Sequence, residues 1–246
     1  MNVKNIKSFI EFYESLGVST YLSQSPRFSN ITNNSNIKER VNTSSMCKQT
    51  RENKIDQLKS LKNKIEKSEC NLKDIASNLV FSDGQYNSKV MLIGEAPGAE
   101  EDKMGKPFVG EAGKLLDKML KFISLDRKDN FYITNVVFWR PPGNRTPNDQ
   151  EIKVCLPFVK EHIKIINPQL IILLGNVAAK SILETDEGIS KIRGKEFFYT
   201  DSENSLKILV IPVFHPAYLL RNPIEKKHMW EDLKKIFEII KEKKIL

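Results

Sequence analysis

The residue whose context best suits it to chemistry is His215, which comes directly after a strongly apolar stretch. Residues 210–214 read Val-Ile-Pro-Val-Phe, and Pro216 follows the histidine at once. The stretch predicts a buried strand that delivers one imidazole to the edge of a sheet, where it can act as an acid, a base or a hydrogen-bond donor. The other two histidines, His162 and His228, lie in helical patterns and are expected to serve packing or the surface.

The segment after His215 predicts contact with a nucleic acid. It reads Pro-Ala-Tyr-Leu-Leu and ends in Arg221. Leu219 and Leu220 are apolar where a loop in water would carry polar residues, and apolar side chains of this kind can insert into a stack of bases. Arg221 would hold a backbone phosphate during that insertion. Together with a glycine turn upstream, the segment points to an enzyme that works on a nucleic-acid base.

The glycine turn, Gly94-Glu-Ala-Pro-Gly98, follows the apolar run Val90-Met-Leu-Ile93. Glycine permits close approach of the backbone, and Pro97 stiffens the turn. Glu95 carries the chemistry, because a carboxylate at the edge of a sheet can orient a water molecule or stabilise a cation. The pattern alone is common where strands end, and the acidic residues 100–102 that follow are expected to form a solvated loop.

Two further side chains suit the recognition of a base. Phe108, in the loop before a helix, is either core filler or a flat platform, and stacking of a base on an aromatic ring is worth about 1–3 kcal/mol. Gly110 and Gly113 would let the backbone approach a phosphate at the start of that helix. Asn135 ends a strand and offers one acceptor and two donors, which match the O4 and N3–H edge of uracil and mismatch cytosine. The alternative for Asn135 is a cap on the strand turn.

A rigid cationic loop, Trp139-Arg-Pro-Pro-Gly-Asn-Arg-Thr-Pro147, lies further along the chain. Its arginines, Arg140 and Arg145, are candidate phosphate contacts. The alternative is a crossover that its prolines stiffen and whose arginines point into solvent.

The elements that must position these residues alternate between strands and helices. Apolar runs that predict strands buried on both faces cover residues 90–93, 131–137, 170–175 and 208–214. Helical patterns cover residues 112–123, 149–166, 177–183 and 225–243. This alternation predicts an α/β fold, a three-layer α/β/α sandwich around a mostly parallel four-stranded sheet. Ligands bind at the carboxyl ends of parallel strands, and the candidate residues lie there.

Composition and charge restrict the class of protein. The 246-residue chain has 39 Lys and Arg against 31 Asp and Glu, a formal net charge of +8. This charge suits a polyanionic partner and equally a lysine-rich protein without one. No apolar run is long enough to span a membrane, no secretion signal is recognisable, and three widely spaced cysteines do not make a disulfide framework. These features predict a cytoplasmic protein.

The first part of the chain, residues 1–69, is expected to be an arm outside the domain formed by residues 70–246. The arm combines a short amphipathic helix over residues 6–13, a polar linker over 23–36 and a polar helix with a narrow apolar stripe over 50–68. Nothing in the arm suggests chemistry, so we interpret it as a helical and flexible, solvated appendage.

Taken together, the motifs resemble those of the family 4 uracil-DNA glycosylases. The two signature stretches are residues 94–98 and 215–221, and matching segments lie between them in the same order, at residues 106–113, 132–137, 140–145 and 192–195. The resemblance covers the chain from residue 70 to its C-terminus. It implies a three-layer α/β/α fold, flipping of deoxyuridine out of DNA and hydrolysis of its N-glycosidic bond.

The resemblance also implies roles by position. Phe108 would stack on uracil, Asn135 would read its polar edge, and His215 would stabilise the negative charge that grows on O2. Glu95 would place the water molecule or balance the sugar cation, and Leu219 would fill the vacated stack. The turn would contact the substrate through Gly94, Ala96, Pro97 and Gly98.

The chain departs from the family in its cysteines. Family 4 members hold a [4Fe–4S] cluster with four thiolates. Cys70 and Cys155 match the first and last ligand positions. Lys73 and Trp139 stand at the second and third, and Cys47 has no matching context. The resemblance implies a cluster, whereas two remaining thiolates argue against one, and Trp139 would fill the space by packing. Hydrolysis itself requires no metal.

The sequence thus predicts a monomeric enzyme whose partner is uracil-containing DNA, single- or double-stranded. Two alternatives stay open: a glycosylase fold that only binds DNA, and a glycosylase for another deaminated base. Intact Glu95, Phe108, Asn135 and His215 favour catalysis, because a pure binder has no need of all four.

Overall fold

The computed structural model describes residues 44–201 and 206–246, with the backbone alone for residues 44–53. The helix expected over residues 6–13 and the linker expected over 23–36 lie outside these ranges, and so does the side chain of Cys47. The chain divides into two compact units, Met1–Gln49 and Thr50–Leu246. The sheet and the helices that cover it belong to the second unit, apart from the first residues of the helix that begins at Ser44.

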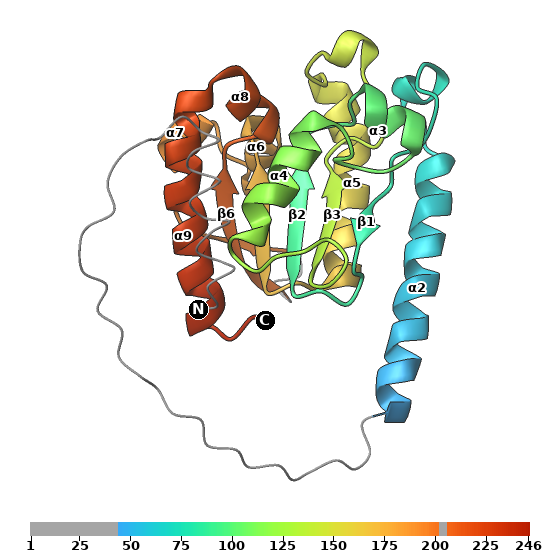
Figure 1. Cartoon of the computed structure of the whole chain (residues 1–246). Coiled ribbons are helices and arrows are strands. Elements are labelled where there is room, and N and C mark those ends of the chain that lie inside the picture. Colours follow the sequence, from blue (N-terminus) through green and yellow to red (C-terminus); the bar gives the residue numbers. More distant parts are fainter. Residues whose placement is uncertain (1–43, 202–205) are drawn as a thin grey trace, which may run out of the picture. The chain divides into compact units, whose positions relative to one another are not determined.

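Within the described residues, six strands form one sheet in the order β1-β3-β2-β4-β6-β5. The strands are β1 Asp83–Gly84, β2 Val90–Gly94, β3 Phe131–Asn135, β4 Leu170–Leu174, β5 Phe197–Thr200 and β6 Lys207–Val213. The inner four run parallel and confirm the four predicted apolar runs (Figure 1). The expected count of four was too low, because antiparallel edge strands flank them. β1 is only two residues long. β5 reads Phe-Phe-Tyr-Thr, and only one of its four residues is buried, so it lacks the long apolar run of the inner strands.

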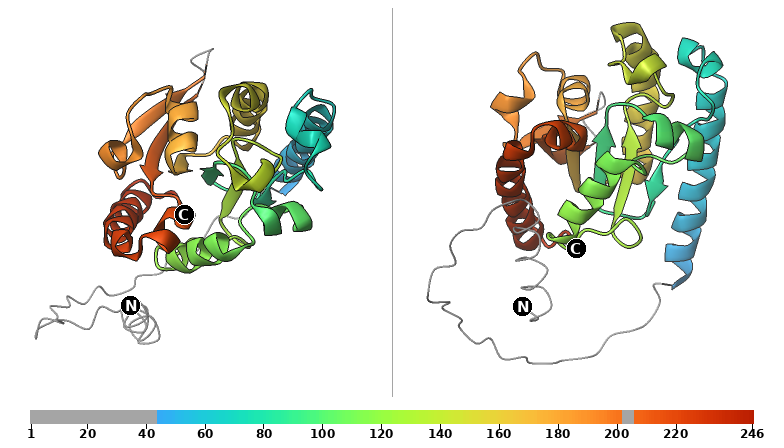
Figure 2. Two further views of the ribbon diagram at one scale, coloured as in Figure 1. Left: turned by 90° about the horizontal axis from the view of Figure 1, so that it is seen from above. Right: turned by 45° about the horizontal axis from the view of Figure 1, so that its top comes forward.

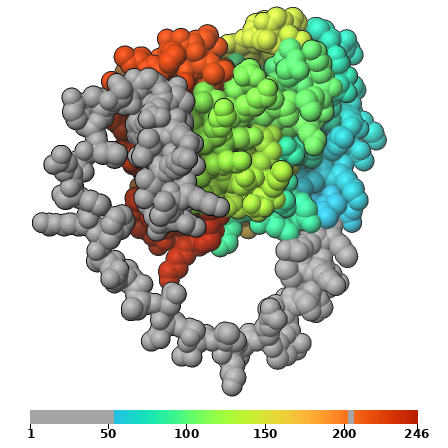
Figure 3. Space-filling model, viewed as in Figure 1, coloured from blue at the N-terminus to red at the C-terminus, as the bar shows by residue number. Residues whose placement is uncertain are grey.

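Helices cover both faces of the sheet. They are α2 Ser44–Glu66, α3 Ala99–Met104, α4 Glu111–Lys121, α5 Asp149–Ile166, α6 Asn176–Leu183, α7 Ile189–Ile192, α8 Pro216–Arg221 and α9 Lys226–Glu242. Two views agree that α4 and α9 lie on one face and α5 and α6 on the other (Figures 1 and 2). In the space-filling view the green segment, which includes α3 and α4, forms a continuous layer of side chains (Figure 3). The predicted three-layer sandwich is confirmed. No helix in the described part of the chain is both long and apolar enough to cross a membrane.

The start of α5 shows how local sequence fixes an element beside the site. Asn148 precedes the helix, and its Oδ1 accepts a hydrogen bond from the Glu151 backbone N at 2.9 Å. The Glu151 carboxylate in turn accepts from the Asn148 N at 2.9 Å. This reciprocal capping box satisfies two backbone donors that a helix start would otherwise leave free.

The structure places the domain boundary earlier than the expected residue 70. The compact unit begins at Thr50. Leu58, Leu61 and Ile65 of α2 are buried in the same core cluster as residues of α5 and the sheet. The narrow apolar stripe is therefore a core face of the domain, and the solvated appendage predicted for residues 50–68 was wrong.

Candidate active site

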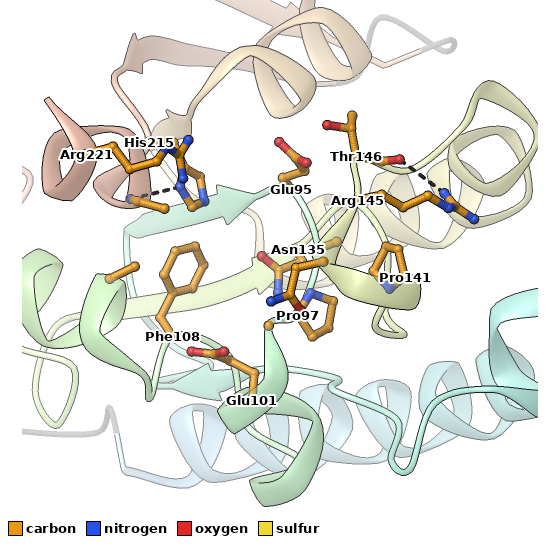
Figure 4. A pocket seen from close by; sticks show the side chains of 15 residues that line it. Glu95, Pro97, Glu101, Phe108, Asn135, Pro141, Arg145, Thr146, His215 and Arg221 are labelled. Carbon is orange, nitrogen blue, oxygen red and sulfur yellow. Dashed lines mark hydrogen bonds between the residues drawn. The ribbon is translucent and has the colours of Figure 1, made fainter.

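The carboxyl ends of the parallel strands meet at one edge of the sheet, where a cavity of about 370 Å³ opens. In the register of β2 and β3, Gly94 stands opposite Asn135, so the end of β3 lies beside the turn that leaves β2. β6 ends at Val213 and leads into His215, which begins α8. Figure 4 shows side chains from these elements around a single opening. The cavity is lined by Glu95, Ala96, Pro97, Gly98, Glu101, Phe108, Ala112, Asn135, Pro141, Asn144, Arg145, Thr146, His215, Ala217 and Arg221.

Gly94 makes room for the side chains expected to recognise a base. A Cβ added at Gly94 would lie 2.4 Å from Cζ of Phe108 and 2.5 Å from Oδ1 of Asn135. Such separations are shorter than van der Waals contact, so only glycine lets the ring and the amide pack over the end of β2. Gly94 therefore leaves the space that these two side chains occupy.

Asn135 carries an unpartnered polar atom into this cavity. Its side chain is 1% exposed, and no donor among the described residues reaches Oδ1. A buried oxygen without a hydrogen bond costs about 1–3 kcal/mol. Asn135 therefore does not cap the strand turn through Oδ1, which was the alternative expected from the sequence. A ligand that donates a hydrogen bond to Oδ1 would remove this cost.

His215 is a neutral hydrogen-bond donor at the start of α8. Its Nδ1 accepts a hydrogen bond from the Ala217 backbone N at 3.2 Å. Burial lowers the pKa of His215 to about 4, and the positive charge of Arg221 adds to the effect. Near neutral pH the imidazole is uncharged, and because Nδ1 is an acceptor, the proton lies on Nε2. The Phe108 ring lies 5.8 Å away between centroids.

Glu95 is the titratable carboxyl that follows β2. It is half-buried and lines the cavity. Burial raises the pKa of Glu95, and the nearby charge of Arg221 opposes the rise. A carboxylate with a raised pKa is a stronger proton acceptor than one in water.

The segment after His215 is a helix, α8, and not the loop that was expected. Pro216 occupies its first position, where proline fits because no intrahelical donor is lost. Leu219 is 0% exposed and belongs to the core, so the wedge role predicted for it was wrong. Leu220 is 43% exposed. Successive residues of a helix point in different directions, which separates the two leucines.

The arginines of the 139–147 loop already have partners. Arg145 donates two hydrogen bonds to Glu151 at 2.9 and 2.6 Å and a third to the Thr146 carbonyl at 3.1 Å. Arg140 donates through Nε to Asn144 at 2.7 Å and does not line the cavity. Arg140 therefore braces its own loop, and Arg145 ties the loop to α5. A phosphate contact would rest on the guanidinium N–H groups that these bonds leave over.

Glu101 is a cavity residue that the sequence pattern did not reveal. Its Oε1 accepts hydrogen bonds from the backbone N of Val109 at 2.9 Å and of Gly110 at 2.8 Å. Asp102 is buried and accepts from two backbone amides. The solvated loop expected for residues 100–102 is thus the first turn of α3. Carboxylates are favoured in the first turn of a helix, so the run of three acidic residues was a sequence signal for the start of α3. The N–H of Gly110, expected near a phosphate, is occupied by Glu101.

The positions expected to hold a [4Fe–4S] cluster pack without a metal-binding set. Cys70 and Cys155 are buried, and their thiols share a hydrogen bond. Lys73 donates from Nζ to a backbone carbonyl at the end of α2. Trp139 is buried edge-on to Phe138, 6.4 Å between centroids. Among the described side chains, no three His, Cys, Asp or Glu residues form a possible metal site. Two thiols do not fit a cluster that takes four.

The chain is similar in sequence to known proteins of one family. A family model described as the uracil DNA glycosylase superfamily matches residues 81–234. A type-4 uracil-DNA glycosylase of Sulfurisphaera tokodaii is 42% identical over 190 residues, which are 75% of this chain and 86% of that protein. One of Saccharolobus solfataricus is 41% identical over 197 residues, 78% and 90% of the two chains. One of Thermotoga maritima is 39% identical over 175 residues, 70% and 88% of the two chains.

Proposed function

This chain belongs to the uracil-DNA glycosylase superfamily, in its type-4 group, and we propose that it excises uracil from DNA during repair. The observation that carries the proposal is the unpartnered Oδ1 of Asn135, buried beside Phe108 at the end of β3. Uracil would donate from N3–H to this oxygen and accept at O4 from the amide NH2. Cytosine has an acceptor and a donor at these two atoms, so it would leave both halves of the amide mismatched.

The base would reach this amide by flipping out of the DNA. The cavity of about 370 Å³ is in the range of sites that take small molecules, about 300–1,000 Å³. Flipping costs a few kcal/mol, and stacking on Phe108 would return about 1–3 kcal/mol of that cost. Leu220, the exposed leucine of α8, replaces Leu219 as the side chain that would fill the gap in the stack.

Cleavage of the C1′–N1 bond sends its electron pair onto uracil and leaves an oxocarbenium-like sugar. His215 would donate from Nε2–H to the uracil O2, where negative charge develops. The depressed pKa of His215 keeps this group neutral, so it stabilises the anion without giving up its proton. A donor fixed in a site that excludes water stabilises charge far better than the same donor in solution.

Glu95 would complete the hydrolysis. A water molecule adds to C1′ as the sugar cation forms, and its proton passes to the carboxylate. Burial raises the pKa of Glu95 and makes it the better acceptor. The positive charge of Arg221 keeps enough of the carboxyl ionised to act. Arg221, at the exposed end of α8, would also contact a phosphate.

We propose that this enzyme works without a [4Fe–4S] cluster. Packing supports the proposal, since α2 joins the core through Leu61 and Ile65 and pairs Lys64 with Glu161 of α5 at 2.7 Å. These contacts hold α2 to the sheet and α5, a task that a cluster bound between Cys70 and Cys155 would otherwise share. Protein purified without oxygen after growth with iron should contain no stoichiometric iron and no visible absorption. Iron and sulfide near four atoms of each per chain would overturn the proposal.

The working form is proposed to be a monomer in a reducing compartment. The two described cysteines, Cys70 and Cys155, are free thiols, which such a compartment maintains. Light scattering during gel filtration tests the monomer, and a dimer mass would contradict it.

The decisive assay measures the free base released from oligonucleotides. The substrates carry one deoxyuridine, alone or opposite guanine or adenine, and matched strands carry hypoxanthine or xanthine. We expect free uracil and an alkali-labile abasic site from the deoxyuridine strands. Folded protein that binds these strands and releases no base would instead be a DNA-binding module. Faster release of hypoxanthine or xanthine than of uracil would assign another deaminated base.

A further inference from the structure

Phe108 has a backbone conformation that an aromatic residue seldom adopts. Its φ is 54°, in the left-handed region, where the Cβ of a bulky residue crowds the neighbouring carbonyl. Such a conformation persists only when surrounding contacts determine it. The contacts around Phe108 therefore decide where its ring points.

Arg127 holds the carbonyl groups on both sides of the Phe108 Cα. Its Nη1 donates to the Pro107 carbonyl at 2.7 Å, and its Nη2 donates to the Phe108 carbonyl at 2.8 Å. The guanidinium is itself fixed by Asp83 of β1 at 3.1 Å and by Asp117 of α4 at 3.0 Å. The Arg127 side chain is only 14% exposed. A planar fork held by two carboxylates gives both carbonyls a defined direction.

Glu101 holds the same segment by accepting hydrogen bonds from the backbone amides of the segment. Its carboxylate accepts from Val109 N and Gly110 N, the two residues after Phe108. The φ and ψ of Phe108 are rotations between the peptide plane before it and the plane after it. Arg127 fixes one atom of each plane, and Glu101 fixes a second atom of the later plane. Together they set the backbone angles of Phe108.

Gly113 leaves space for this arrangement on α4. A Cβ at Gly113 would lie 1.9 Å from the Phe108 carbonyl oxygen. The carbonyl that Arg127 holds is thus pressed against the first turn of α4, where only glycine fits. Glycine is therefore needed at position 113 because of the close approach of the Phe108 carbonyl. Gly113 was expected from the sequence to let the backbone approach a phosphate.

We propose that Arg127, assisted by Glu101, is a positioning residue that presets the Phe108 ring as the platform for the flipped base. The inference rests on the proposed function. Arg127 is not among the residues that line the cavity, so it acts through Phe108 and not on the substrate. A preset platform spares the enzyme the cost of ordering the ring when the base enters.

The test compares two strands that differ at one nucleotide, which has a base in one strand and none in the other. One carries 2′-fluoro-2′-deoxyuridine, which resists cleavage, and the other a tetrahydrofuran abasic analogue. Arg127→Met should weaken binding of the fluorodeoxyuridine strand about tenfold, part of the 1–3 kcal/mol that stacking contributes. Binding of the abasic strand should change less than about twofold, because no base meets Phe108 there. In a Phe108→Ala background, Arg127→Met should have no further effect on the fluorodeoxyuridine strand.

Two further variants keep the test informative if Arg127→Met folds poorly, as thermal unfolding would show. Arg127→Lys retains the charge and loses the fork to two carbonyls, so it should lose most of the preference for the base. Asp117→Asn retains the fork and removes the negative charge of one anchor, so it should lose less. Equal weakening on both strands, or an effect that persists with Phe108→Ala, would overturn the positioning role. Wild-type protein that binds fluorodeoxyuridine no better than thymidine in the same strand would overturn the proposed function instead.

Discussion

Asn135→Asp tests most directly how the base is read. The substitution keeps one oxygen, which can accept from N3–H of uracil, and replaces the NH2 donor by a second oxygen. The uracil O4 would then face an oxygen in a cavity where the native side chain is 1% exposed. A lost hydrogen bond, an unmatched buried acceptor and repulsion from a carboxylate together cost about 2–4 kcal/mol. The value of kcat/KM for uracil release should therefore fall by about 30- to 1,000-fold.

The assay is single-turnover release of uracil from a single-stranded deoxyuridine oligonucleotide near neutral pH. Asn144→Asp is the matched control, because Asn144 lines the same cavity but is exposed. Its φ of 56° suits Asp as well as Asn, and a carboxylate still accepts from Arg140. The added charge at the rim is screened by solvent, so we expect a change of less than about threefold.

Lower pH provides a second check on the same variant. A buried carboxyl has a raised pKa, and once protonated it donates a hydrogen bond to O4 as the amide did. The deficit of Asn135→Asp relative to wild type should therefore shrink as the pH falls. A loss below about threefold at neutral pH, or equal losses in both Asp variants, would refute the assigned reading of the base.

Four further predictions concern two leucines and two histidines whose surroundings differ. Leu219→Ala should lower the free energy of unfolding in urea by about 2–5 kcal/mol, since it opens a cavity in the core. Leu220→Ala should leave that energy unchanged and slow uracil release from double-stranded but not single-stranded DNA, which has no stack to fill. His215→Leu should lower the single-turnover rate by about 100-fold, the effect of removing one donor to a developing anion, with little change in DNA affinity. Burial lowers the pKa of His162 to about 3, against about 6.5 unfolded, so its contribution to stability is complete above the unfolded pKa and is lost as the pH falls toward 3. His162→Phe should remove about 2–3 kcal/mol of pH dependence in urea unfolding between about pH 7 and about pH 4.5, and an unchanged dependence would show that His162 is not the group responsible.

The inner sheet was predictable because its strands are buried on both faces. β2 and β4 are short apolar runs, and β3 and β6 are mainly apolar. That pattern is typical of a parallel sheet between two helix layers. The edge strands bury too little to show it. α8 was missed because a helix of six residues is too short to show a repeating apolar pattern. A polar residue followed by proline, as at Pro216, is nevertheless a recognised helix start.

The site was predictable to the extent that it follows from strand ends. Glu95, Asn135 and His215 each lie at or just beyond the end of a parallel strand, so the topology alone brings them together. Arg127 and Glu101 could not be found in this way. Their partners are backbone atoms of residues 107–110, and a side chain that bonds a distant backbone leaves no periodic or compositional signal in the sequence.

Three features of the cavity disfavour the folded state, and the proposed binding of a base would offset all three. Asn135 has an unpartnered oxygen, Phe108 has a positive φ, and His215 has lost its water. His162 is also buried without a partner for either ring nitrogen, but it lies among aromatic rings such as Phe81, 4.5 Å away, outside the cavity. An unmet group of that kind only lowers stability. Under the proposed function, uracil would supply a donor for Asn135, a face for Phe108 and an acceptor for His215 in one step. The convergence of these costs on one cavity, more than any one of them, supports the proposed site.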